Sequence, residues 1–136
     1  MWSGVQLSLV SMPVPARFSG AIRGDARGVT VSYCGNSGSA GAPESQAPQR
    51  YPTSRRTFRR LRVCVLENTF EVVLPVTLCR NGGEPTALQV VVPAGAIAGQ
   101  KYVRDVPPIR FEDGEDYDVQ LTVNGDGAAK ISVSVE

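Results

Sequence analysis

Apolar and polar residues alternate with a period of two along much of this chain, and this pattern limits the possible folds more than any other feature. Near the C terminus, apolar side chains occupy every second position in 117–123 and again in 131–135, with the sequence Asn-Gly-Asp-Gly at 124–127. A period of two places the apolar side chains on one face of an extended strand. The pattern therefore predicts two strands, each with one apolar and one polar face, joined as a β-hairpin.

The same pattern recurs earlier in the chain. Val72–Leu78 and 88–92 flank the sequence Arg-Asn-Gly-Gly at 80–83, which predicts a second hairpin, because Asn and Gly accept the positive φ of tight turns. Apolar residues alternate with arginine and cysteine in Leu61–Val65, which predicts a strand with a basic outer face. Weaker strand patterns cover Val5–Val10, Val29–Cys34 and Tyr102–Val106.

Eight or so short strands separated by turns predict one all-β domain spanning residues 1–136. Glycine and proline together make up 24 of the 136 residues, which is typical of a chain with many turns. Half-apolar sheets must cover each other, so we expect an antiparallel β-sandwich of jelly-roll type, with a closed barrel as the second architecture. Residues 35–50 carry almost no apolar mass and predict a long exposed loop, while residues 1–20 suggest an extended N-terminal arm.

Composition argues against an enzyme. The chain has no histidine, which removes the commonest general base and the usual metal ligand, so we expect neither catalysis nor a cofactor. Its three cysteines follow no metal-binding spacing, and we expect them to be free thiols, with a Cys64–Cys79 bridge across neighbouring strands as the alternative. No apolar run approaches the roughly 18 residues of a membrane-spanning helix, so we expect no contact with a membrane.

Charge is distributed unevenly along the sequence. Residues 1–62 contain nine arginines and two acidic residues, whereas residues 63–136 contain five basic and eleven acidic residues. Two unlike patches on one module favour self-association or docking on an acidic shell. Arginine pairs with carboxylates through a planar fork and is enriched at protein interfaces. The predicted interface residues are the arginines of the cluster and two aromatic residues near the N terminus: Arg55, Arg56, Arg59, Arg60, Arg62, Trp2 and Phe18.

Each of these features has an alternative interpretation. Trp2 and Phe18 can cap the sandwich within the chain instead of anchoring an arm in another subunit. Tyr51 and Phe58 flank the arginines, as stacking platforms do in proteins that bind single-stranded nucleic acid, but the acidic second half makes such a partner the lesser candidate. The acidic residues of Glu112–Asp118 could hold calcium; without a regular calcium-loop pattern, a solvated turn is favoured.

The order of these features from residue 51 onward is similar to that in small virion proteins of tailed bacteriophages. The matching segments are the basic lead with its strand, the Asn-Gly hairpin closing on Ala-Gly, and the acidic turn before the last two strands: YPTSRRTFRRLRVCVLEN, VTLCRNGGEPTALQVVVPAG and FEDGEDYDVQLTVNGDGAAKISVSV. This resemblance includes jelly-roll-like capsid decoration or cement proteins and the head domains of phage fibres. It covers residues 51–136 well and residues 1–50 loosely.

The resemblance implies a non-enzymatic virion component. We expect a capsid decoration protein, made in the host cytoplasm, that binds the outside of the major capsid protein shell as a homotrimer and stabilises it. A receptor-binding or fibre-head domain is the alternative within the same resemblance. A small-virus coat protein or nucleic-acid-binding module is the alternative from a different class.

Overall fold

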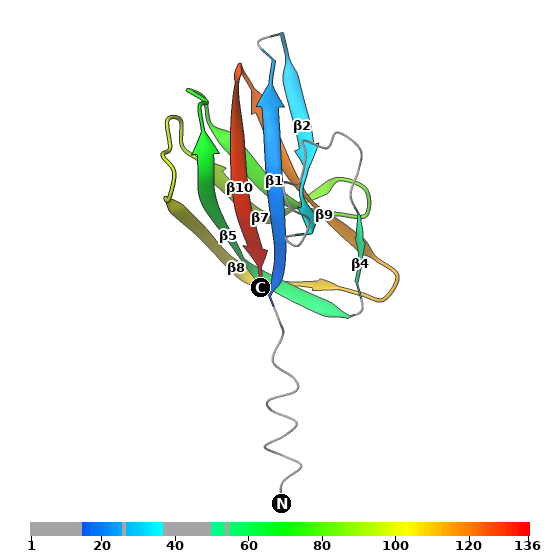
Figure 1. The fold of residues 1–136 in the computed structure, drawn as a ribbon. Helices are drawn as coiled ribbons and strands as arrows, with labels where there is room; N and C mark the ends of the chain where they lie inside the picture. Colours follow the sequence, from blue (N-terminus) through cyan, green and yellow to red (C-terminus); the bar gives the residue numbers. More distant parts are fainter. Residues whose placement is uncertain (1–14, 26, 37–49, 54) are drawn as a thin grey trace, which may run out of the picture.

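The computed structural model describes residues 15–25, 27–36, 50–53 and 55–136, and this part of the chain forms two antiparallel sheets packed face to face (Figure 1). Sheet A contains, in spatial order, β3 (Gly35–Asn36), β1 (Ala16–Gly24), β10 (Gly127–Val135), β5 (Arg56–Asn68) and β8 (Lys101–Phe111). Sheet B contains β2 (Val29–Tyr33), β9 (Asp116–Asn124), β6 (Leu74–Arg80) and β7 (Glu84–Val92), with β4 (Tyr51–Pro52) also paired to β9.

The predicted all-β antiparallel β-sandwich is confirmed. Eight of the ten strands have five or more residues, and the other two, β3 and β4, are two-residue strands. Within the described residues, no helix is long and apolar enough to cross a membrane.

Alternating side chains of both sheets meet in one core. On β5, Leu61, Val63 and Val65 are at most 1 % exposed, whereas Arg60 before Leu61 and Arg62 after it face outward. Because β10 pairs with β5 in the register Val133↔Val63, the apolar residues of neighbouring strands share one face. A slip of one residue would turn arginines into the core, so the apolar pattern fixes the register.

Aromatic rings fill the core at the end where β5 and β9 begin. The ring of Tyr117 lies 5.1 Å from Phe58, 5.6 Å from Tyr51 and 6.0 Å from Phe18, measured between ring centroids. Phe111 packs edge-on against Phe58 at 5.4 Å. Such tilted and edge-on ring pairs stabilise the fold beyond the free energy that burial of the rings alone contributes. The hydroxyl of Tyr51 donates a 2.8 Å hydrogen bond to the carbonyl of Cys34, so its polar end is satisfied.

The prediction that the last two strands form a hairpin is wrong. The strands exist, but β9 pairs with β2 and β6 in sheet B, while β10 pairs with β1 and β5 in sheet A. The turn between Asn124 and Gly127 carries the chain from one layer to the other, so the apolar faces of β9 and β10 face each other across the core. By contrast, the hairpin of β6 and β7 is confirmed, with Asn81, Gly82 and Gly83 at positive φ in its turn.

Residues 16–20, predicted as part of an extended arm, instead belong to β1, which lies between β3 and β10 in sheet A. Gly20 and Ala21 interrupt the alternation there and hide the strand. Gly20 is required at this position, since a Cβ would lie 2.7 Å from Cys34 Sγ and 2.8 Å from Leu121 Cδ1. The predicted strand Val5–Val10 and most of the predicted loop 35–50 lie outside the described residues.

Replacing Phe18 tests its place in the core. We expect Phe18→Ala to lower the free energy of unfolding by about 3–5 kcal/mol, as for other buried phenylalanines, in urea denaturation of the purified chain. Arg17→Ala, at the exposed neighbouring position, is the matched control and should change it by less than about 0.5 kcal/mol. A Phe18→Ala effect as small as that of the control would place this ring outside the core.

Candidate binding surface

The outer face of sheet A gathers basic and small polar side chains from four strands. Register places one row across the sheet consisting of Arg17, Ser134, Arg62 and Val103. The next row consists of Ser19, Ser132, Cys64 and Lys101. We call these eight residues the basic face. The alternation that sends the apolar residues of β1, β10, β5 and β8 inward sends these side chains outward.

A shallow depression of about 220 Å³ lies in the basic face. Ser132, Ser134 and Cys64 are short and form its floor, while the longer side chains of Arg62 and Lys101 line it. Small side chains in the middle of the sheet, with longer ones beside them, leave a hollow whose lining includes two serines and two cationic residues.

Acidic residues neutralise part of the positive charge at one end of this face. Arg60 Nε lies 2.5 Å from Asp105 Oδ1, and this hydrogen bond is the main reason that the pKa of the carboxyl is below its usual value. Arg60 and Arg62 also each lie 3.7 Å from the carboxylate of Glu136. Among the described residues, however, Arg17 and Lys101 pair with no acidic side chain.

This arrangement suits the binding of an anionic surface. Arginine and lysine can pair with carboxylates, and serine hydroxyls can donate or accept hydrogen bonds beside them. The eight residues include no aromatic ring, so the face offers no platform on which a sugar ring or a base could stack.

The five predicted arginines do not form one patch. Arg60 and Arg62 lie on the outer side of sheet A, with side chains 37 % and 51 % exposed. Arg59 is exposed and close enough to Asp105 to lower the pKa of that carboxyl slightly. Arg56 places its guanidinium over the ring of Phe58 at 4.7 Å, and Arg55 lies 3.7 Å from Asp113. A register shift between Phe58 and Arg60 in the pairing of β5 with β8 divides these arginines into two groups.

The acidic turn before β9 contacts arginines of its own chain. Arg110 lies 2.8 Å from Glu112, Arg55 lies 3.7 Å from Asp113, and Arg80 lies 3.4 Å from Glu115. The uneven distribution of charge in the sequence is thus largely balanced within the fold. This removes the electrostatic reason for expecting unlike patches of two copies to meet.

The carboxylates of this turn do not converge on one point. Glu115 also accepts hydrogen bonds from the backbone N–H of Glu112 and from Asn81, and these contacts lower its pKa. Asp118 lies on the outer face of sheet B, beyond the turn. Within the described residues, no group of three potential ligands could hold a metal ion. The calcium hypothesis therefore gains no support from the geometry.

The predicted aromatic interface residues have different outcomes. Phe18 is 2 % exposed and packs between Tyr51 and Tyr117, so the intramolecular alternative is correct and its ring is not presented to a partner. Trp2 lies outside the described residues. Phe58 is fully buried, and Tyr51 is turned into the core, so the two rings that flank the arginines in sequence provide no stacking platform for nucleic acid.

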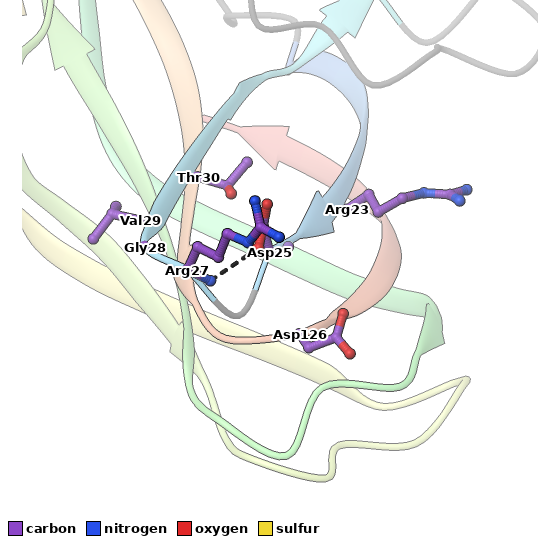
Figure 2. A pocket seen from close by; sticks show the side chains of 8 residues that line it. Arg23, Asp25, Arg27, Gly28, Val29, Thr30 and Asp126 are labelled. Carbon is purple, nitrogen blue, oxygen red and sulfur yellow. Dashed lines mark hydrogen bonds between the residues drawn. The ribbon is translucent and has the colours of Figure 1, made fainter.

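A second hollow, of about 640 Å³, lies where the β1–β2 and β9–β10 turns meet (Figure 2). Asp25 and Arg27 lie close together there, because the backbone N–H of Arg27 donates a 2.9 Å hydrogen bond to Asp25 Oδ1. Figure 2 shows the side chain of Arg23 pointing away from them, and Asp126 on the neighbouring turn. The charges of two arginines and two aspartates balance in this open hollow. It is therefore a weaker candidate for a binding surface than the basic face.

Three of the eight residues of the basic face lie outside the strands predicted from the sequence. Arg17 and Ser19 belong to β1, which was not predicted as a strand, and Lys101 lies one residue before the predicted strand 102–106. The serines of β10 were visible as the polar face of the last strand, but nothing in the sequence placed that strand beside β5. Ser132 and Ser134 lie next to Arg62 only because β10 belongs to sheet A and pairs with β5.

Asp118 is a buried carboxylate on the outer face of sheet B. It is 1 % exposed, accepts a 2.9 Å hydrogen bond from Gln120 Nε2 at Oδ2, and has no hydrogen-bond partner at Oδ1 among the described residues. Burial raises its pKa, although the charge of Arg50 and the bond from Gln120 oppose this effect. The same burial raises the pKa of the neighbouring Cys79 thiol to about 12, so this thiol is neutral and unreactive.

Comparison with known proteins identifies no family for this chain. No protein-family model matches it, and no curated protein matches it. Among solved structures, one similar chain is described as "Crystal structure of PirA", with a TM-score of 0.48 and 12 % sequence identity, over 93 % of this chain and 99 % of that chain. So distant a likeness says nothing about what this chain binds.

Asp118→Asn should stabilise the chain near neutral pH. Folding raises the pKa of the Asp118 carboxyl above its value in the unfolded chain, about 3.9. The chain therefore loses stability as the pH rises from the unfolded-state pKa through the folded-state pKa. Asparagine is neutral throughout, so we expect a gain on the order of 1 kcal/mol at pH 7 that disappears toward pH 3.5, measured by thermal unfolding across this range. Asp126→Asn, at an exposed position, is the control. An equal gain in stability at pH 7 and at pH 3.5 would contradict a raised pKa for Asp118.

Proposed function

We propose that this chain is a non-enzymatic binding protein that docks on an acidic protein surface through the basic face. The observation that carries the proposal is that cationic side chains without an acidic partner lie on the same face as serine hydroxyl groups. Arg17 and Lys101 lack acidic partners among the described residues, and they lie across the sheet from each other on either side of Ser132 and Ser134. An acidic partner would supply the missing carboxylates.

The shape of the face favours a broad partner over a small molecule. Its residues come from four adjacent strands, which together span about 14 Å at about 4.8 Å between strands. The depression within it is small and shallow, about 220 Å³, so it does not enclose a ligand. The fork of Arg62 suits bidentate pairing with a carboxylate, and the absence of an aromatic ring from the basic face disfavours sugars and unpaired bases.

The sequence resemblance supplies the candidate partner. We propose that the acidic surface belongs to the major capsid protein shell of a tailed phage and that the chain acts there as a decoration or cement protein. Many weak ion pairs repeated over a shell give strong attachment, because each additional subunit contact is made at high effective concentration. A clamp that binds only the assembled shell stabilises it against disruption. A homotrimer on the virion exterior remains part of this proposal.

Reversal of charge on the basic face tests docking. Arg62→Glu combined with Lys101→Glu should weaken binding to poly-L-glutamate, the acidic polypeptide probe, by about tenfold or more, since each lost ion pair is worth roughly 1 kcal/mol and repulsion replaces it. The matched control, Arg27→Glu with Arg55→Glu, makes the same change of net charge away from the basic face. Equal losses in both variants would contradict docking through this face. Binding of single-stranded oligonucleotide with a steep salt dependence would favour nucleic acid as the partner instead.

Removal of the chain from its particle tests the cement role. We expect phage particles that lack this protein to release their genome at a lower temperature than complete particles, because the clamp no longer opposes internal pressure. Genome release can be followed by fluorescence of a DNA-binding dye during heating. Purified wild-type chain should restore heat resistance, and the double variant of the basic face should not. Unchanged heat resistance without the chain would contradict a cement role.

A further inference from the structure

The outer face of sheet B differs in chemistry from the outer face of sheet A. Register places one row across its four strands, consisting of Tyr33, Gln120, Thr77 and Gln89. The next row toward the β9–β10 turn consists of Val31, Thr122, Pro75 and Val91, and Asn124 pairs with Val29 beyond it. We call these ten residues the uncharged face, because none of them carries a formal charge.

The uncharged face presents apolar surface to solvent. Val29 is 63 % exposed and Val91 is 47 % exposed, on the two outermost strands of the sheet, β2 and β7. Val31 and Pro75 between them are half-buried. Asp118 lies in the row beyond Gln120 but is 1 % exposed, so its carboxylate adds no charge to this surface. Contiguous exposed apolar surface of this kind marks a site of contact with another surface.

The polar groups within the uncharged face indicate the kind of partner that fits it. Gln120 Nε2 donates a 2.9 Å hydrogen bond to Asp118 Oδ2, and Gln89 Nε2 donates one of 2.9 Å to Thr77 Oγ1. Each amide has a carbonyl oxygen and a second N–H beyond these bonds. The interior of a lipid layer would leave such groups without hydrogen bonds. A charged partner would meet no opposite charge on the uncharged face.

We propose that the uncharged face packs against the same face of a second copy of this chain. A face that meets itself forms a two-fold contact, in which each residue near the axis lies opposite its own counterpart. Because the face carries no charge, this contact brings no like charges together. Amides and hydroxyls both donate and accept, so an identical face supplies both kinds of partner. The sheets of the two copies would stack at about 10 Å, the ordinary spacing of packed sheets.

The size of the uncharged face determines the strength of the contact. Four strands about 4.8 Å apart and three rows about 6.8 Å apart, with half a spacing beyond each edge, cover roughly 400 Å². A standard protein interface buries roughly 800 Å² on each partner, about twice this area. We therefore expect a weak, reversible pair that forms as the concentration of the chain rises.

This contact is independent of docking on an acidic surface. The uncharged face and the basic face lie on opposite layers of the sandwich (Figure 1). Pairing through sheet B leaves the basic face open, and it is separate from the contacts of a homotrimer, since two-fold pairing joins copies by twos. The inference thus goes beyond the proposed function. Loss of docking would leave pairing intact, and loss of pairing would leave docking intact.

Sedimentation of the full-length chain over a range of concentrations tests the pairing. We expect wild-type mass to double as concentration rises, and Val91→Glu to raise the dissociation constant of the pair at least tenfold, because a carboxylate would be buried in the contact. Leu66→Glu is the matched control, since Leu66 is 49 % exposed on β5 of sheet A, and should change this constant less than twofold. A wild-type chain that remains unpaired up to about 1 mM, or equal effects of the variant and the control, would overturn the proposal.

Mixing of variants tests whether the partner is a second copy. Thr122 lies near the centre of the uncharged face, so Thr122→Glu and Thr122→Lys each bring like charges together when a variant pairs with itself. A mixed pair brings opposite charges together instead. We expect a mixture of the two variants, each with a different tag, to form pairs that contain both tags at concentrations at least tenfold below those at which either variant pairs alone. Leu66→Glu mixed with Leu66→Lys should show no such gain.

Binding to a neutral lipid surface is the competing outcome. Wild-type chain that binds phosphatidylcholine vesicles and does not pair in solution would overturn the proposal, because the uncharged face would then serve a membrane. Equal pairing of the mixed and unmixed Thr122 variants would overturn it as well, since the residue would not lie opposite its own counterpart. The proposal predicts no vesicle binding and a gain in pairing on mixing.

Discussion

The burial of two alternating apolar faces against each other is the constraint on which the rest of this structure depends. Leu61 and Val63 are inside, so Arg60 and Arg62 must be outside, since a strand has a period of two. The aromatic rings around Tyr117 extend this constraint from β9 to β1, β4, β5 and β8. The basic face is therefore a consequence of core packing, because the inner residues of four strands determine which side chains share the outer surface.

Alternation along the sequence was sufficient to predict most of the longer strands, but it did not predict which strands are neighbours. The two C-terminal strands were recognised, yet they lie in different layers, because two half-apolar strands can satisfy burial either side by side or face to face. Local turn residues did not distinguish these cases: the glycine-rich turn of β6 and β7 makes a hairpin, and that of β9 and β10 makes a crossing. Sequence could not reveal β1 either, because the close approach of Cys34 and Leu121 requires Gly20 in the middle of the strand.

The charged residues show the same limit of prediction from sequence, because their neighbours depend on the fold. Separation of basic and acidic residues along the chain suggested two unlike patches, but folding brings Arg55 and Arg80 next to Asp113 and Glu115. Among the cationic residues without an acidic partner in the described part of the chain, Arg17 and Lys101 come from strands distant in sequence and face outward on the same side of sheet A as Ser132 and Ser134. Neither residue stands out in the sequence, because their common surface exists only through the pairing of β10 with both β1 and β5.

Protection of Cys64 on binding is the most direct test of the basic face. Its thiol is half-buried in the floor of the depression, whereas Cys34 and Cys79 are buried and their pKa values are raised. A neutral maleimide should therefore label Cys64 faster than the other two cysteines in the free wild-type chain, as read by mass spectrometry. In the presence of capsid shells, the proposed partner, we predict that labelling of Cys64 slows at least tenfold. An unchanged rate in the bound chain would contradict docking through this face.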